Sequence, residues 1–255
     1  GGALRCGSGG NHISTVSDCD FVNNTAGSRG AIYVTGAAVI EKCLFNGNAS
    51  TEGPGAIEGG TDTVLPLYIN KCTFLGNSGM DGGAVLGGLN TLVVNSIFVQ
   101  NKARRDGGAI YIFGSSGSPV VNSCTFTMNQ ANTDTTGGSG SAIHASDGMN
   151  LLVYNSILYG DIGDEIAGSS NTVVGHSDIQ GGYSGVGNLN IIPSFIDPPS
   201  SMSDATFDLH LQISPSSSAC INAALDSYPY SPDVDIEETS RPQGSAPDMG
   251  AFECE

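Results

Sequence analysis

Two short motifs of hydrophobic and polar positions alternate along residues 1–161. In the first motif, a cysteine or serine is followed two positions later by an aromatic residue and three positions after that by asparagine. Five copies are present, at Cys19/Phe21/Asn24, Cys43/Phe45/Asn48, Cys72/Phe74/Asn77, Ser96/Phe98/Asn101 and Cys124/Phe126/Asn129, and a degenerate sixth reads Ser156/Leu158/Asp161. Residues two apart share one face of a strand, so the motif predicts a strand with a buried aromatic ring.

The second motif is glycine and alanine followed by an aliphatic residue. Its copies are Gly2-Ala3-Leu4, Gly30-Ala31-Ile32, Gly55-Ala56-Ile57, Gly83-Ala84-Val85, Gly108-Ala109-Ile110 and the variant Ser141-Ala142-Ile143. Successive alanines are 28, 25, 28, 25 and 33 residues apart, so one copy of each motif makes one repeat unit. Such a period predicts the coils of a solenoid, with insertions confined to loops.

The repeats predict an all-β fold, a right-handed single-stranded parallel β-helix of about seven coils over residues 1–190. Residues 191–255 lack the repeat, and we expect them to form an irregular capping segment across the open end. Coils stacked at the ~4.8 Å spacing of paired strands place each phenylalanine above the next and each asparagine above the next. We interpret both series as structural ladders, in which inward-turned asparagines bond backbone groups and one another.

Composition supports strands and turns and excludes some partners. Charged residues make up 13% of the chain, which is low for a soluble domain, while glycine is frequent at 37 residues. The net charge of −17 disfavours binding to nucleic acid and to anionic lipid surfaces. No stretch approaches the ~20 apolar residues of a membrane-spanning helix, so no membrane span is expected.

Acidic residues are concentrated in the last third of the chain. They include Asp233, Asp235, Glu237, Glu238, Asp248, Glu253 and Glu255. Carboxylate oxygens can hold Ca²⁺, but the spaced Asp, Asn and Gly positions of a calcium loop are missing. We therefore expect solvated acidic loops, and no metal or cofactor.

The alternation of Phe-x-x-Asn with Gly-Gly-Ala-aliphatic resembles the repeat of chlamydial polymorphic outer-membrane proteins and related β-helix surface proteins. The resemblance covers residues 1–161 and implies a pectin-lyase-like solenoid at a cell surface. Such proteins include adhesins and autotransporter passengers, so the motif is much less specific for activity than for fold.

A second resemblance lies in the C-terminal third. Its segments are Asn190-Ile191-Ile192-Pro193-Ser194-Phe195-Ile196-Asp197-Pro198, Phe207-Asp208-Leu209-His210-Leu211-Gln212, Ser214-Pro215, Arg241-Pro242-Gln243 and Ala246-Pro247-Asp248-Met249-Gly250-Ala251-Phe252-Glu253. Their order and spacing look like the closing segment of microbial β-helix surface proteins of the choice-of-anchor type. That resemblance implies an extracellular module whose solenoid ends here.

Six of the cysteines fall into two groups. Four share one repeat position and are expected to be buried apolar plugs, namely Cys19, Cys43, Cys72 and Cys124. Stacked neighbours among them, such as Cys43 and Cys72, would lie within disulfide range. Cys220 and Cys254 flank the terminal segment and are candidates for a disulfide that closes it onto the last coil, which requires an oxidising compartment. The chain has no Cys-x-x-Cys pair, so zinc is not expected.

Two sequons make Asn23 and Asn48 candidates for glycosylation, with a rarer Asn-x-Cys at Asn122. Asn48 also belongs to the asparagine ladder and is expected to point inward. Asn23 is therefore the better candidate.

An enzyme is the alternative, because right-handed β-helices include pectate lyases and glycosidases. The candidate carboxylates precede successive Gly-Ala corners, at Asp81, Asp106 and Asp134, and the one cationic cluster is Lys102, Arg104 and Arg105. A glycosidase needs two carboxylates about 5 to 10 Å apart. Aspartate before glycine is, however, the commonest choice in a turn, and the lone His144 is more typical of a structural role.

Together these observations predict an extracellular structural or adhesive surface module, with a polysaccharide lyase or glycosidase as the alternative. The expected ligand is a glycan or another component of a cell surface. The sequence opens in the middle of a repeat unit, at Gly1, so coils or a signal peptide would have preceded it. An uncovered solenoid edge there would favour head-to-tail self-association, which propagates into a filament unless the rotation closes a ring.

Overall fold

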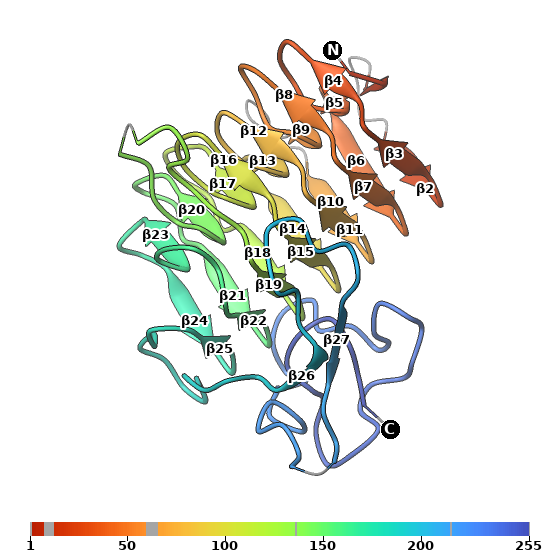
Figure 1. Ribbon diagram of the computed structural model, residues 1–255, viewed down its shortest axis with the longest axis vertical. Coiled ribbons are helices and arrows are strands. Elements are labelled where there is room, and N and C mark those ends of the chain that lie inside the picture. The colour runs from red at the N-terminus through yellow and green to blue at the C-terminus, as the bar shows by residue number, and fades with distance from the viewer. Residues whose placement is uncertain (1, 8–12, 60–65, 136, 215, 255) are drawn as a thin grey trace.

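The computed structural model describes residues 2–7, 13–59, 66–135, 137–214 and 216–254. These residues form a parallel β-solenoid of about seven turns, without any α-helix. Figure 1 shows the coils stacked side by side from the N-terminal to the C-terminal end. The predicted all-β solenoid is therefore confirmed.

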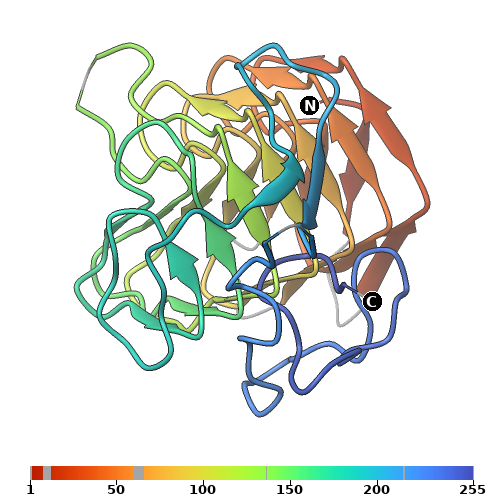
Figure 2. The same ribbon diagram turned by 60° about the horizontal axis from the view of Figure 1, so that its bottom comes forward.

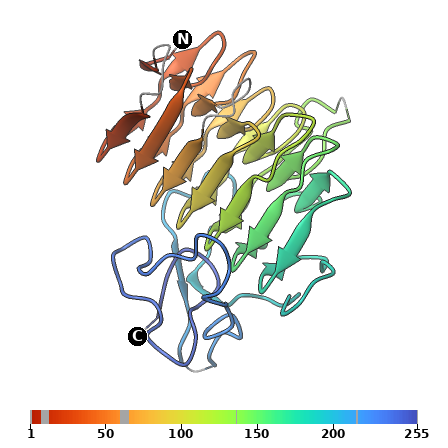
Figure 3. The same cartoon turned by 180° about the vertical axis from the view of Figure 1, so that it is seen from behind.

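Three seven-stranded parallel sheets form the walls of the solenoid. Sheet A contains β1 (Leu4–Cys6), β5 (Ile32–Val34), β9 (Ile57–Gly59), β13 (Val85–Gly87), β17 (Ile110–Ile112), β20 (Ile143–Ala145) and β23 (Ile166–Gly168). Sheet B contains β2 (Ile13–Ser17), β6 (Ala37–Glu41), β10 (Leu67–Asn70), β14 (Thr91–Val94), β18 (Val120–Asn122), β21 (Leu152–Tyr154) and β24 (Val173–Gly175). Sheet C contains β3 (Asp20–Val22), β7 (Leu44–Asn46), β11 (Thr73–Leu75), β15 (Ile97–Val99), β19 (Thr125–Thr127), β22 (Ile157–Leu158) and β25 (Asp178–Ile179). Figure 3 shows sheet B from behind as a row of parallel arrows.

Two smaller sheets complete the fold. Sheet D follows the asparagine position of four coils and contains β4 (Thr25–Ala26), β8 (Ala49–Ser50), β12 (Ser78–Gly79) and β16 (Lys102–Ala103). The C-terminal residues add one antiparallel hairpin of β26 (Phe195–Asp197) and β27 (Asp208–Leu211).

The phenylalanines of sheet C form one continuous stack in the interior. Their rings lie face to face, with centroids 5.0, 4.8, 4.6 and 4.6 Å apart from Phe21 through Phe45, Phe74 and Phe98 to Phe126. The in-register pairing of the strands puts each ring directly over the next. Phe74 is fully buried, and Leu158 continues the column below Phe126.

The asparagines form a hydrogen-bonded ladder at the end of the sheet C strands. Asn77 illustrates the pattern, because its Nδ2 donates to the carbonyl oxygen of Phe45 and to Oδ1 of Asn101 at 2.9 and 3.0 Å. Its backbone N–H also donates to Oδ1 of Asn101, and its own Oδ1 accepts both bonds from Asn48. Each buried amide thus bonds the coil on either side, which satisfies its polar atoms without water.

Asn24, the first member of the ladder, differs from the sequence-based expectation. We expected an inward-turned, buried side chain, yet Asn24 is only half-buried. Its Nδ2 and backbone N–H still donate to Oδ1 of Asn48, at 2.8 and 3.0 Å. In the part of the chain that the structure describes, β3 is the edge strand of sheet C, so no earlier coil covers Asn24. The other four members are fully buried, namely Asn48, Asn77, Asn101 and Asn129.

Residues 183–190 cover the C-terminal end of the solenoid. The backbone of Leu189 pairs with that of Ser177 and Ile179, as an eighth coil would. The Asn188 amide bonds the backbone of Ser177 and Val174, and Tyr183 packs against the interior core. The end cap therefore comes from within the range assigned to the repeats.

The C-terminal segment, described at residues 191–214 and 216–254, lies along the flank of the solenoid rather than across its open end. Ile97 and Val99 point outward from sheet C, yet they are 7% and 0% exposed because this segment packs on them. The corresponding residues of the first coil, Asp20 and Val22, are exposed. Figure 1 shows the β26–β27 hairpin in front of β15 and β19, and Figure 2 shows the same segment from below. The expected position was wrong because residues 183–190 already cover the end of the bore, while the outer face of sheet C offers apolar residues to the C-terminal segment.

Residues 225–238 run along the corner between sheets B and C. This corner is formed by residues with φ between 46° and 54°, at Asp18, Lys42, Lys71, Asn95, Ser123, Asn155 and His176. From the last coil to the second, the side-chain contacts are His176 with Tyr228, Asn155 with Leu225, Asn122 with Pro229, Asn95 with Val234, and Lys71 and Lys42 with Glu238. One stretch of chain is therefore tied to six coils.

Replacing Phe74 with alanine should lower the free energy of unfolding by about 3 to 5 kcal/mol, because it leaves a cavity in the middle of the stack. Urea denaturation followed by far-UV circular dichroism measures the loss. Phe113→Ala is the matched control, since Phe113 is 49% exposed and outside the core. A loss in Phe74→Ala no larger than that of the control would show that the stack does not hold the coils together.

Candidate functional site

The outer face of sheet A presents one continuous column of side chains. Parallel pairing in register aligns Arg5, Tyr33, Glu58, Leu86, Tyr111 and His144 along the solenoid. We call this set the sheet A column. The C-terminal segment covers the other flank, opposite β17, β20 and β23 (Figure 1). Aromatic and charged groups on this uncovered face make it the candidate binding surface.

At the N-terminal end of the sheet A column, two arginines flank an aromatic ring. The guanidinium of Arg29 lies 4.2 Å from the Tyr33 ring centroid, and that of Arg5 lies 5.5 Å from it. Arg29 also forms a 3.2 Å ion pair with Glu58. Arg5, Arg29 and Tyr33 line a pocket of about 300 Å³. Arg29 has φ of 73°, a backbone conformation that the chain gives to glycine at Gly82 and Gly107, so its side chain is retained at some cost in strain.

A second cluster lies at the other end of the sheet A column. The Tyr111 ring packs against those of Phe113 and His144, with centroids 6.3 and 5.3 Å away. The Tyr111 hydroxyl lies 3.2 Å from that of Ser146. Phe113 is half exposed, so this cluster offers an apolar surface beside hydrogen-bonding groups.

The predicted catalytic candidates meet near this cluster without forming a catalytic arrangement. Nδ1 of His144 lies 3.2 Å from Ser139 Oγ and 3.3 Å from Asp106 Oδ1. In a serine hydrolase the aspartate and the serine contact different ring nitrogens, so this contact cannot relay a proton from one to the other. Asp106 also accepts the backbone N–H of Ser139, a hydrogen bond that joins two neighbouring coils.

The remaining candidate charges do not form a catalytic arrangement either. Asp81 forms an ion pair with Arg105 and accepts the backbone N–H of Asp106. Arg104 donates to the carbonyl oxygen of Thr51, and Lys102 lies on β16. Asp134 is exposed in the loop that precedes β20. The structure thus uses Asp81 and Asp106 to join neighbouring coils, as expected of aspartate before glycine.

The cysteines are all free thiols, so the predicted disulfide between Cys220 and Cys254 is absent. Each of the two sulfurs is directed to a different partner: Cys220 Sγ lies 3.4 Å from Asp178 Oδ2, and Cys254 Sγ lies 3.4 Å from the carbonyl oxygen of Leu211. Burial raises the pKa of both thiols, that of Cys254 to about 12. Hydrophobic packing, not a covalent link, therefore holds this end of the segment.

Three of the four repeat cysteines, Cys43, Cys72 and Cys124, are buried as expected, whereas Cys19 of the first coil is only half-buried. Cys43 and Cys72 are buried, and a hydrogen bond from Cys72 lowers the pKa of the Cys43 thiol to about 7. Ser96 takes the same position in the next coil, and its hydroxyl accepts the backbone N–H of Cys72. The side chain at this position therefore fills the interior at a corner of the coil and hydrogen-bonds the backbone.

The two sequons differ in accessibility. Asn23 is exposed at a turn, whereas Asn48 is fully buried in the ladder. The folded chain does not present Asn48 to a glycosyltransferase, so Asn48 is the weaker candidate. Asn122, in the Asn-x-Cys triplet, is buried too. Asn23 stays a prediction.

The acidic residues near the C-terminus are not simply solvated loops. Asp235, Asp248 and Glu253 are buried and accept backbone N–H groups of the C-terminal segment, such as the bonds from Glu253 to Asp235 and from Asp248 to Glu253 at 2.9 Å. Arg241 forms a 3.1 Å ion pair with Glu253 and donates to the carbonyl oxygens of Asp248 and Gly250. Burial lowers the pKa of Arg241 and raises that of Glu253. This network fixes the fold of the segment; Glu255 lies outside the described residues.

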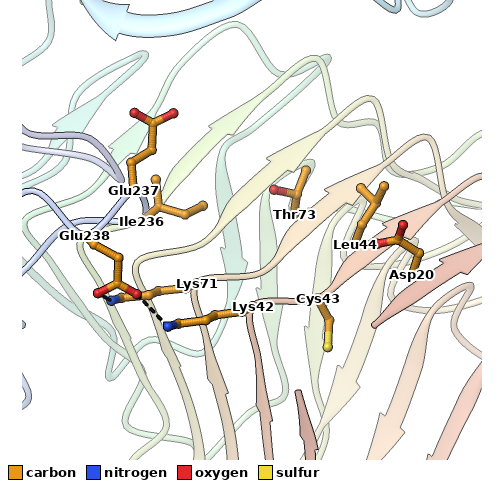
Figure 4. Close-up of a pocket in the computed structure, with 9 residues that line it drawn as sticks. All are labelled: Asp20, Lys42, Cys43, Leu44, Lys71, Thr73, Ile236, Glu237 and Glu238. Carbon is orange, nitrogen blue, oxygen red and sulfur yellow. Dashed lines mark hydrogen bonds and ion pairs between the residues drawn. The ribbon is translucent and has the colours of Figure 1, made fainter. Parts of the chain in front are cut away.

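Glu238 is the exposed end of the same acidic region. The ammonium groups of Lys42 and Lys71 converge on it at 2.7 and 2.6 Å, as Figure 4 shows. These two hydrogen bonds lower the pKa of Glu238 to about 2. The contact lies in a groove of about 460 Å³ between the C-terminal segment and sheet C, lined also by Ile236 and Thr73. Both lysines of the groove pair with Glu238, so we assign this contact a structural role.

Two further searches bear on the site. Among the described residues, no three His, Cys, Asp or Glu side chains gather closely enough to share a metal ion. Within the same residues, no helical segment has the length and hydrophobicity needed to cross a membrane.

Residues 18–35 and 95–112 match the family model of the Chlamydia polymorphic membrane protein repeat. The chain carries repeats of this family. In each match, a sheet C strand and its asparagine corner lead to the Gly-Ala turn and a sheet A strand. Chlamydial polymorphic membrane protein repeats indicate a surface or outer-membrane protein. No curated protein and no solved structure shows significant similarity to the chain.

Arg241→Ala should loosen the C-terminal segment while leaving the repeats folded. The change leaves Glu253 buried without its cation, and breaking a buried ion pair in this way costs about 3 to 5 kcal/mol. Limited proteolysis read by mass spectrometry should show cleavage within residues 191–255 at least about tenfold faster. Arg105→Ala removes an exposed ion pair, and the protease should cleave this variant at nearly the wild-type rate. Equal rates in the two variants would contradict a role of Arg241 in fixing the segment.

Proposed function

We propose that the chain is an extracellular adhesive module that binds a cell-surface ligand through the sheet A column. The observation that carries this proposal is the alignment of Arg5, Tyr33 and Tyr111 on a face that the C-terminal segment leaves uncovered. Tyrosine and arginine supply most of the binding energy in many interfaces. The presence of surface-protein repeats supports an extracellular location.

The rigidity of the solenoid favours adhesion. Paired strands hold the two ends of the sheet A column in fixed positions, so a ligand meets a preformed surface. Preformed surfaces spend little free energy on ordering side chains at binding. The strained conformation of Arg29, which places its guanidinium against Tyr33, agrees with a surface retained for recognition.

The geometry favours this function over polysaccharide cleavage. Asp81 is paired with Arg105, and Asp106 bonds a turn, so neither carboxylate is directed at an open groove as a free acid or base. A lyase needs a cationic base beside bound substrate, yet the Arg105 guanidinium is held by Asp81. Hydrogen bonding to that carboxylate raises the pKa of Arg105, so even less of it is in the neutral form that can accept a proton. Head-to-tail self-association stays a prediction from the sequence.

The proposal is tested by binding of the fluorescently labelled chain to cultured cells and to a panel of immobilised glycans. A double variant, Tyr33→Ala with Tyr111→Ala, should reduce binding at least about tenfold, as expected for hot-spot side chains. Tyr230→Ala, an exposed tyrosine of the C-terminal segment, is the matched control and should bind as wild type does.

Two outcomes would contradict the proposal. Binding that survives the double variant would place the ligand elsewhere on the molecule. Turnover of pectin, alginate or a β-glycan that disappears in Asp106→Ala would instead favour the enzyme.

A further inference from the structure

Two inward-facing columns of the solenoid end in acidic residues within one coil. The asparagine ladder ends at Asp161, whose Oδ1 accepts the backbone and side-chain N–H groups of Asn129. The alanine column of the second motif ends at Glu165, whose backbone carbonyl accepts the N–H of Ala142 just as Ala142 accepts that of Ala109. Asp161 is 6% exposed and Glu165 is 4% exposed. Both columns thus place a carboxyl group inside the end of the solenoid.

The two carboxyl groups contact each other, and three of their four oxygens receive no hydrogen bond from any other described residue. They lie within hydrogen-bonding reach of one another. Oδ2 of Asp161 and both carboxyl oxygens of Glu165 are buried without a hydrogen-bond partner. Burial raises the pKa of both groups, and the negative charge of Asp161 raises that of Glu165 further. Buried acceptors in this state are costly unless a positive species joins them.

A polar pocket of about 390 Å³ leads from solvent to Glu165. Asp164 and Gln180 line it together with the backbone of three glycines, Gly163, Gly181 and Gly182. Asp178, buried beneath, adds negative charge near Glu165. The pocket therefore offers an ion a path to the carboxyl pair and room for water molecules as additional ligands.

We propose that Asp161 and Glu165 bind a calcium ion at the C-terminal end of the solenoid. Ca²⁺ takes about six to eight oxygen ligands from carboxylates, carbonyls and water, with flexible geometry. The carboxyl pair supplies three unpartnered oxygens, and pocket water supplies further ligands. A net charge of −17 attracts cations to the molecule. Extracellular calcium-binding modules have dissociation constants of about 10⁻⁴ to 10⁻³ M, and we use that range for the test.

The test compares thermal unfolding in EDTA with unfolding in about 10 mM calcium chloride, well above that range of dissociation constants. Calcium should raise the Tm of the wild-type chain by about 3 to 10 °C. Asp161→Asn and Glu165→Gln should not respond, because each replaces one carboxylate by an amide that donates to the other. Asp161→Asn should fold, since asparagine fills this position in five earlier coils, and Glu165→Gln should fold because glutamine has the same shape as glutamate. In EDTA each should unfold at a higher temperature than the wild type.

Asp147→Asn is the matched control, because it removes one negative charge from an exposed turn between β20 and β21. It should respond to calcium as the wild type does. No calcium shift in the wild type, or an equal shift in Asp161→Asn, overturns the proposal.

A pH series in EDTA identifies the alternative, a carboxyl pair that shares one proton. A group with a raised pKa in the folded state loses stability as pH rises through that pKa. The shared proton would replace calcium as the explanation under two conditions. The Tm of the wild type would not change with calcium but would fall with rising pH, and the Tm of Glu165→Gln would show no such fall.

Discussion

The hydrogen bonds between asparagine side chains of neighbouring coils set the register on which the rest of the structure depends. Each ladder amide inside the stack must reach the carbonyl oxygen of one coil and the amide of the next, as Asn77 does with Phe45 and Asn101. A slip of one residue would leave these buried groups without partners and turn the phenylalanines out of the core. The face-to-face rings, the corner thiols and the alignment of sheet A all follow from this register.

The interior was predictable from the sequence because its residues recur at the same position of every repeat. Phe74 and Asn77 each have equivalents in the neighbouring coils, and periodicity alone placed them in ladders. Periodicity did not reveal that Asn24, at the edge of sheet C, is less buried than its equivalents, because burial depends on the coil before it.

The packing of the C-terminal segment on the flank was not predicted, although the sequence contains a signal for it. Ile97, Phe98 and Val99 are apolar on both faces of one strand, which indicates that its outer face is covered. The network around Arg241 could not be inferred, because its partners are brought together by irregular turns rather than by a period. The sheet A column was predictable in its backbone but not in its surface, because the backbone repeats from coil to coil while the side chains change. Only the three-dimensional register shows which of its charges share a face.

The C-terminal segment changes how this molecule carries mechanical load. A solenoid in which each coil touches only its neighbours can peel open from one end, one coil at a time. Here Glu238 forms ion pairs with lysines of the second and third coils, and Tyr228 hydrogen-bonds His176 of the seventh. The same stretch of chain therefore spans nearly the whole stack. Force applied to one end is shared across the corner contacts of six coils rather than borne by a single strand pair. The segment links coils that are not neighbours, so distant coils are expected to open together in one cooperative step.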